Sequence, residues 1–251
     1  MKKLGALLAV LALAGCHHAA PPPVVAAPAA PGLAHGIDMA TDARDVSMEL
    51  TGSRVDFVAR YYRDPASRWP TLSPAEARML SAAGKEVVAV WESHSGNPAY
   101  FSYASGYADA AAAYRQAKAV GQPAGSAIYF AVDFNAYQPD ILGPIDRYFR
   151  GILAGLQVAA GGHAPEYRVG VYGSGAVCDY LKRARLAQLT WLSNSTAWAG
   201  HDQFGGWDIR QGPQSAGLSF SHDSNEARGD YGGFRVPAIS AALGGGRRDA
   251  L

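Results

Sequence analysis

Short apolar runs alternate with longer helical patterns along most of this chain, and that alternation limits the folds open to it. Strand-like runs joined by helices imply parallel strands with crossover connections. Three helical patterns stand out, over residues 73–83, 105–120 and 139–160. Eight runs are typical of strands, namely residues 35–38, 56–61, 86–92, 127–133, 168–172, 189–193, 207–211 and 218–222.

Eight strands in about 200 residues predict an α/β fold of the TIM (β/α)8 type, compact and irregular in its last strands. The irregularity is expected because the late connections are short and weakly helical. A doubly wound open sheet is the alternative. That fold usually has a Gly-rich phosphate loop after its first strand, and no such loop follows Asp38.

The N-terminal residues have the features of an export signal rather than of the fold. Lys2 and Lys3 precede an apolar stretch over 4–13, which is followed by small residues and Cys16. The segment resembles a bacterial lipoprotein signal, and this resemblance implies that residues 1–15 are removed and that Cys16 is lipidated. We therefore expect a protein of the cell envelope, anchored to a bacterial membrane through this lipid and facing the periplasm or the exterior. An ordinary secretory peptide is the alternative.

The remaining chain divides by composition. Residues 16–34 are an Ala/Pro-rich tether, residues 35–237 are long enough for one large barrel domain, and residues 238–251 are expected to be a flexible tail. A net charge of +1 and a charged fraction of 17% give no sign of a nucleic-acid partner. A monomer is expected.

Other chemistries lack their sequence patterns. No His-Glu-x-x-His or Cys-x-x-Cys motif is present, so we expect no metal site, and we expect no cofactor. No Gly-x-Ser-x-Gly elbow is present either. With Cys16 lipidated, Cys178 has no partner for a disulfide.

Several strand-like runs end in a charged residue. Enzymes with TIM barrels carry their chemistry at the C-terminal ends of the strands, so these side chains are expected to form a ring at one barrel mouth. Strand parity places Asp133 on the inward face with Tyr129, and the same counting predicts that Arg60 faces inward and keeps a neighbouring carboxylate ionised. The predicted ring is Asp38, Arg60, Glu92, Asp133 and Asp223.

Polar and aromatic residues beside these ends suit a glycan cleft, because a flat ring with a polar group binds a sugar well. Parity predicts that Tyr61 and Trp91 face the helices instead. The residues expected to bind substrate or to support the site are Tyr62, Tyr129, Tyr172 and Gln211.

Five blocks of the chain resemble a known family. The blocks are residues 35–38, 57–62, 128–133, 169–173 and 223–225. They are similar to a bacterial glycoside-hydrolase-like family of unknown function, related to the TIM-barrel lysozymes of glycoside hydrolase family 25. The resemblance implies that Asp38, Asp133 and Asp223 are site residues. It also places Asn135 where the lysozymes have the glutamate that acts as general acid.

Glycoside hydrolysis needs a carboxyl group that protonates the leaving oxygen and a carboxylate that stabilises or attacks the sugar. Asp38, Glu92 and Asp133 supply enough groups, with Glu92 or Asp133 as the acid and the other, together with Asp38, as nucleophile or electrostatic support. We expect an enzyme acting on a cell-wall glycan such as peptidoglycan. Three alternatives remain open: an ion network without chemistry, a catalytically inactive glycan-binding barrel, and an Asn135 that either orients substrate or caps a turn.

Overall fold

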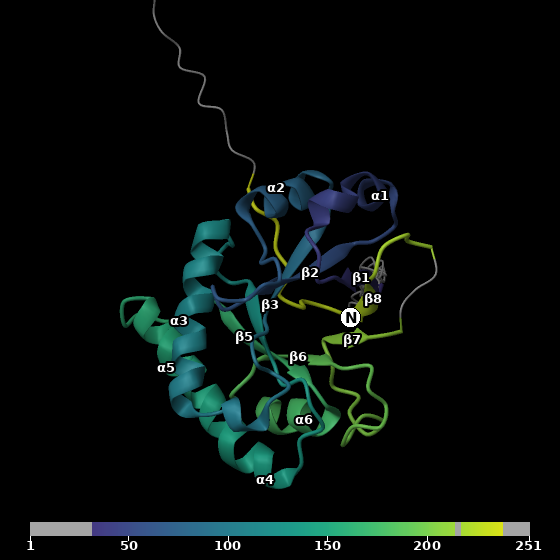
Figure 1. Ribbon diagram of the computed structural model, residues 1–251. Coiled ribbons are helices and arrows are strands. Elements are labelled where there is room, and N and C mark those ends of the chain that lie inside the picture. Colours follow the sequence, from purple (N-terminus) through teal and green to yellow (C-terminus); the bar gives the residue numbers. More distant parts are fainter. Residues whose placement is uncertain (1–31, 214–216, 238–251) are drawn as a thin grey trace, which may run out of the picture. The chain divides into compact units, whose positions relative to one another are not determined.

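Eight strands close into a barrel in the computed structural model, which describes residues 32–213 and 217–237 (Figure 1). Each strand pairs with the next one in sequence, and the last pairs with the first. The predicted closed barrel is confirmed, and the open-sheet alternative is wrong. The strands are β1 (Ala34–Asp38), β2 (Phe57–Tyr62), β3 (Glu86–Trp91), β4 (Ala127–Ala131), β5 (Arg168–Gly173), β6 (Leu189–Leu192), β7 (Ile209–Gln211) and β8 (Asp223–Ala227).

The eighth strand departs from the prediction. It is not the run 218–222 but β8, and it lies antiparallel to both β7 and β1, whereas β1 to β7 pair in parallel. An antiparallel strand can start at the rim where its predecessor ended, so no crossover helix is needed between β7 and β8. Asp223, the first residue of β8, therefore pairs with Asp38, the last residue of β1, at one rim of the barrel.

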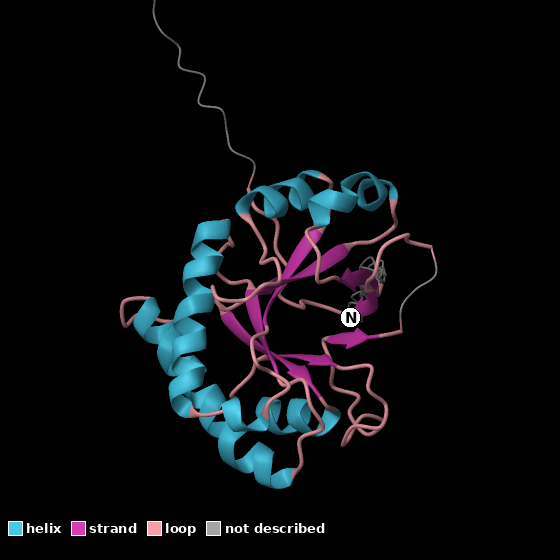
Figure 2. Ribbon diagram, in the orientation of Figure 1, coloured by secondary structure: helices cyan, strands magenta, loops and turns pink. Residues whose placement is uncertain are grey.

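Helices flank the barrel beside most strands, whereas loops lie beside β7 (Figure 2). The predicted helix 139–160 contains a π-helical turn at Pro144, a residue that has no N–H to donate within the helix. Ser73 caps α2 in a capping box with Glu76. The helical segments are η1 (Ala43–Val46), α1 (Ser47–Gly52), α2 (Pro74–Ala82), η2 (Pro98–Tyr100), α3 (Tyr103–Val120), α4 (Gln138–Asp140), η3 (Ile141–Ile145), α5 (Asp146–Ala159) and α6 (Gly175–Arg183).

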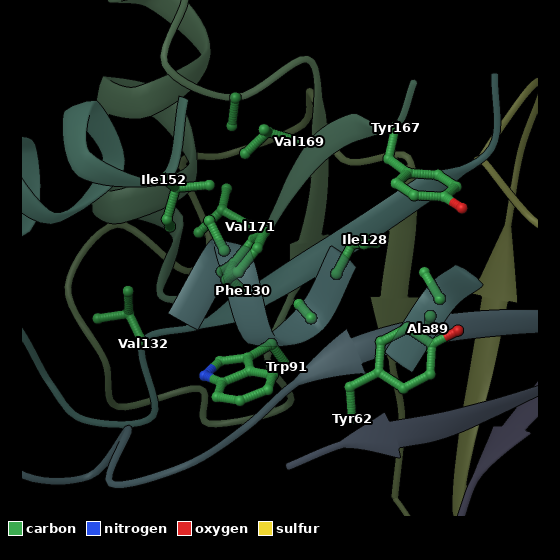
Figure 3. Packing of buried hydrophobic residues seen from close by; sticks show 14 of the residues in the cluster. Tyr62, Ala89, Trp91, Ile128, Phe130, Val132, Ile152, Tyr167, Val169 and Val171 are labelled. Atoms are coloured by element: carbon green, nitrogen blue, oxygen red, sulfur yellow. The ribbon is translucent and has the colours of Figure 1, made fainter. Parts of the chain in front are cut away.

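The strands separate two hydrophobic layers. One layer packs between the barrel and the helices, where Trp91, Phe130, Val171 and Ile152 of α5 belong to one buried cluster (Figure 3). Gly151 lets α5 approach α3 closely in this layer, because a Cβ there would lie 2.1 Å from the carbonyl oxygen of Tyr103.

The second layer fills the barrel interior. Its side chains include Phe57, Val88, Tyr129 and Trp191. Gly36 of β1 leaves room for one of them, since a Cβ at this position would lie 2.3 Å from the ring of Phe57. Buried apolar residues therefore occupy most of the interior, and polar groups gather at its rim.

Strand β2 has the opposite facing from the prediction. Phe57, Ala59 and Tyr61 face the interior, while Arg60 and Tyr62 face the helices. The predictions that Arg60 and Tyr62 point into the mouth are therefore wrong. The prediction that Tyr61 faces the helices is also wrong. The Tyr62 hydroxyl donates to Gln122 Oε1 at 2.8 Å, on the outer side of the barrel.

Arg60 faces outward because Glu76, the carboxylate that pairs with it, lies on the outer side of the barrel. Its guanidinium forms a fully buried ion pair with Glu76 of α2, and Nη1 donates to the Met39 carbonyl oxygen at 2.7 Å. Glu76 also accepts from the Ala43 backbone N–H at 2.8 Å. A charged pair buried to this extent is tolerated only when its hydrogen bonds are satisfied.

Replacing Glu76 with Ala is expected to lower the free energy of unfolding by about 3–5 kcal/mol, because the buried guanidinium of Arg60 loses its counter-charge. Denaturant unfolding followed by circular dichroism measures the change. The exposed pair of Asp179 and Arg183 on α6 provides the control, and Asp179→Ala should change stability little. Equal effects of the two substitutions would contradict the role given to Glu76.

Candidate active site at the barrel mouth

A cavity of about 280 Å³ opens at the rim where β1 to β7 end and β8 begins. The structure brings six of the predicted site residues together here: Asp38, Glu92, Asp133, Tyr172, Gln211 and Asp223 line it. The lining also includes residues that the sequence did not indicate as site residues, among them Tyr61, Trp191, Asn194 and Ser195.

Asp38 is the most enclosed carboxylate of this cavity, with only 5% of its surface exposed. Asn225 Nδ2 and Gln211 Nε2 donate to Oδ2 at 2.8 and 3.0 Å, and the Tyr61 hydroxyl donates to Oδ1 at 3.1 Å. Burial raises the pKa of Asp38 to about 6, even though these three donors favour the charged form. The donors also fix the direction of the carboxylate.

One amide connects several strands around Asp38. Gln211 Nε2 also approaches Asp223 Oδ2 at 3.4 Å, while its Oε1 accepts from the Tyr172 hydroxyl at 3.0 Å. The same Tyr172 hydroxyl lies 3.1 Å from Ser193 Oγ. Gln211 therefore orients groups from β1, β5 and β8 toward a shared cavity.

Glu92 directly follows β3 and is half-buried. Burial is the main cause that raises the pKa of Glu92 to about 7, and the charge of Asp133 raises it further, while Arg63 opposes the rise. A carboxyl group with this pKa holds a proton over part of the neutral range, as a general acid must. Of the two candidates for the acid, Glu92 has the environment that suits the role.

Asp133 lies beyond the end of β4, at the exposed edge of the cavity. Its backbone N–H donates to the Ser95 carbonyl oxygen at 3.0 Å, which fastens the loop after β3 to the chain after β4. Partial loss of solvent raises the pKa of Asp133. The loop contact keeps Asp133 beside Glu92, while its exposure leaves the carboxylate accessible to a substrate.

Besides Arg60 and Tyr62, two further predicted residues lie away from the cavity lining. Tyr129 faces inward as predicted, but it is fully buried below the mouth and its hydroxyl donates to the Tyr231 carbonyl oxygen at 2.8 Å. Asn135 Oδ1 accepts from the Ala199 N–H at 2.9 Å, and Asn135 Nδ2 donates to the Tyr137 hydroxyl at 3.0 Å. The N-cap of the following helix is Tyr137, so Asn135 fastens a loop instead of capping that helix.

Asn225 and Arg63 were missed as site residues for different reasons. Asn225 lies within a block of the family resemblance, but its contact with Asp38 depends on the antiparallel pairing of β8 with β1. Arg63 follows β2, and its position beside Glu92 depends on the facing of that strand. Neither arrangement has a local sequence pattern.

A larger cavity, of about 1070 Å³, is bordered by residues of α1, β1, β7 and β8. Asp38, Glu92 and Asp133 are absent from its lining, so its size does not make it the site of carboxylate chemistry. Within residues 32–213 and 217–237, no group of three or more His, Cys, Asp or Glu side chains could hold a metal ion. None of the helices in those same ranges has the length and apolar character needed to cross a membrane. Cys16 lies outside the described residues.

Comparison with known proteins finds a matching family and relatives. The family described as the Rv2525c-like, glycoside hydrolase-like domain matches residues 48–236. The uncharacterized proteins FadG and YbfG of Bacillus subtilis (strain 168) are 30% identical over 168 residues and 31% identical over 156 residues. These matches cover 66% and 57% of this chain but only 28% and 21% of the two relatives. The chain thus spans less than a third of their length.

Solved structures share the fold. The Tat-secreted protein Rv2525c of Mycobacterium tuberculosis has a TM-score of 0.66 at 21% identity, over 80% of this chain and 99% of that one. The catalytic domain of endolysin ply40, from bacteriophage P40 of Listeria monocytogenes, has a TM-score of 0.50 at 14% identity, over 80% and 95% of the two chains. At these identities the similarity shows a common fold.

The pKa of Glu92 is expected to move in opposite directions when its two charged neighbours are removed. Asp133→Asn should lower it below about 7, since the carboxylate that disfavours ionisation is gone, and Arg63→Met should raise it. Titration of the side-chain carboxyl ¹³C shift measures both variants. Shifts of the same sign, or none, would contradict the electrostatic arrangement described here.

Proposed function

This chain belongs to the Rv2525c-like, glycoside hydrolase-like family, and we propose that it hydrolyses glycosidic bonds of a cell-wall glycan at its barrel mouth. The observation that carries the proposal is the pair of Glu92 and Asp133 at the edge of one cavity. There, burial and the charge of Asp133 raise the pKa of Glu92 to about 7. Such a pair supplies the acid and the carboxylate that glycoside hydrolysis requires.

In the proposed mechanism, Glu92 donates its proton to the leaving glycosidic oxygen. Asp133, exposed at the mouth, is the carboxylate that acts on the sugar, either directly or through a water molecule. Asp38 is held by three donors and is nearly enclosed, so its role is to stabilise positive charge that develops on the sugar. Tyr172 and Asp223 complete the cavity wall.

The cell wall is the proposed location of the substrate for two reasons. The first is the resemblance of the N-terminus to a lipoprotein signal, from which we propose export, lipidation of Cys16 and a position at the cell envelope, facing the periplasm or the exterior. The second is the fold shared with the catalytic domain of a phage endolysin. We further propose that the fold is a variant of the TIM barrel of family 25 lysozymes and that the protein is a monomer.

A catalytically inactive glycan-binding barrel is the second candidate. Asn135 favours it, because the family resemblance places an acid at this position and an amide cannot protonate a leaving group. The side chain of Asn135 also has both ends engaged, with Ala199 and Tyr137. Asn135→Glu distinguishes the two candidates, since a gain of activity from an inactive wild type would indicate a binding protein that lacks its acid.

Glu92→Gln should lower turnover of purified peptidoglycan about 10²–10⁴-fold while leaving binding intact, because the amide keeps the shape but cannot donate the proton. Release of reducing ends measures turnover, and sedimentation with the insoluble glycan measures binding. Asp133→Ala should also abolish release. Binding without turnover in the wild type as well would favour the inactive barrel.

The pH dependence of kcat/KM on a soluble glycan should be bell-shaped, with its maximum between about pH 6 and 7. Activity requires Asp38 to be ionised and Glu92 to be protonated, so it falls below the pKa of Asp38 and above that of Glu92. Arg63→Met should move the alkaline limb upward, because it raises the pKa of Glu92. An unchanged alkaline limb in that variant would argue against Glu92 as the acid.

A further inference from the structure

A second cavity adjoins the barrel mouth. It has a volume of about 380 Å³ and shares Glu92 and Asp133 with the first cavity, so a glycan lying over these carboxylates extends into both. Arg63 and Trp69, from the loop after β2, border it together with His94, from the loop after β3. We call this space the Arg63 cavity.

Arg63 is held in a fixed position. Gln116 of α3 binds its backbone at both polar atoms, with Arg63 N–H donating to Oε1 at 3.2 Å and Nε2 donating to the Arg63 carbonyl oxygen at 2.6 Å. The guanidinium carbon lies 4.2 Å from the centre of the Tyr61 ring. The hydroxyl of Tyr61 in turn contacts Asp38. The cation is thus attached to the same framework as the carboxylates.

The charge of Arg63 has no carboxylate partner within residues 32–213 and 217–237. Nη1 makes a long hydrogen bond of 3.4 Å to the Glu92 carbonyl oxygen, and Nε is buried without a hydrogen-bond partner among these residues. Arg60, by contrast, is fully paired with Glu76. Because Nε is buried, an anionic ligand would bind this half-buried guanidinium through its two terminal nitrogens, which can donate two parallel hydrogen bonds to a planar anion.

We propose that Arg63 determines specificity by binding the carboxylate of a sugar that occupies the Arg63 cavity. The proposal rests on the function proposed above. Trp69, whose surface is 50% exposed, provides a flat face for the same sugar. Asp64, Glu92 and Asp133 also border the cavity and disfavour a densely charged polyanion. The substrate is therefore a glycan with an isolated carboxylated sugar next to the bond that lies over Glu92 and Asp133.

The carboxylate could come from the lactyl ether of muramic acid or from a uronic acid, and binding experiments distinguish the two. Isothermal titration calorimetry in a Glu92→Gln background prevents turnover and removes the titration of Glu92. The ligands are a muramic-acid oligosaccharide free of peptide, the same oligosaccharide with its carboxylates amidated, and an oligosaccharide of alternating glucuronic acid and N-acetylglucosamine.

Arg63→Met should weaken binding of the carboxylated muramic-acid oligosaccharide about 10–100-fold, with less than about a twofold effect on the amidated form. Arg78→Met is the matched control, because Arg78 is exposed on α2 and lies outside the lining of both cavities, and it should have less than about a twofold effect on either ligand. Arg63→Lys keeps the positive charge but lacks the planar guanidinium. It should therefore reduce affinity less than Arg63→Met does, and only for the carboxylated ligands.

Equal losses with carboxylated and amidated ligands, or no loss with either, would overturn the role of Arg63. Dependence on Arg63 for the glucuronic acid ligand alone would support the role and identify a uronic acid as its target. If the Glu92→Gln protein binds none of the three glycans, the function proposed above fails. If all three glycans bind tightly and Arg63→Met weakens none of them, the proposed function is still supported and only the role given to Arg63 is rejected.

Discussion

The site depends on the antiparallel pairing of β8 with β1. This pairing closes the barrel, and it also sets Asp223 opposite Asp38 and Asn225 opposite Gly36. Asn225 Nδ2 can then donate to the carboxylate of Asp38, beside the amide of Gln211 from β7. A parallel eighth strand would begin at the far rim, and its first residues would lie away from the mouth. The reversed direction of one strand thus determines which polar groups surround the most deeply buried acid.

Burial of these acids explains why they have unusual pKa values. The interior below the mouth is filled by Phe57, Tyr129 and Trp191, so little water reaches Asp38 from beneath. Burial disfavours the ionised form of Asp38, and its three hydrogen-bond donors offset this effect only in part. The pKa of Asp38 therefore rises to about 6. Among the described residues, the carboxyl group of Glu92 accepts a hydrogen bond only from Ser95 Oγ, at 3.5 Å, and burial together with the charge of Asp133 raises its pKa to about 7. The mouth therefore holds one carboxyl group oriented by three donors and another that faces a second carboxylate, and burial raises the pKa of both.

The sequence predicted much of the barrel because its periodic apolar runs are local signals. Seven strands lie close to the predicted ranges, and Asp38, Glu92 and Asp133 follow from their positions at strand ends. The eighth strand was misplaced because its sequence, Asp-Ser-Asn-Glu-Ala, has hardly any apolar character, and backbone pairing with β7 and β1 stabilises it instead. The facing of β2 could not be predicted because the partner of Arg60, Glu76, lies on a helix 16 residues further along the chain.

The outward facing of Arg60 matters for the chemistry. An arginine pointing into the mouth would have stabilised the charged form of the nearest carboxylate and lowered its pKa. By pairing Arg60 with Glu76 outside the barrel, the fold keeps that charge away from Glu92. Arg63 then acts on Glu92 from the edge of the cavity, where it opposes the rise in pKa without abolishing it. Because Arg63 has no carboxylate of its own among the described residues, an anionic ligand that bound it would weaken this opposition and further favour the protonated form of Glu92. Recognition of a carboxylated sugar and protonation of the acid would then be coupled through one side chain.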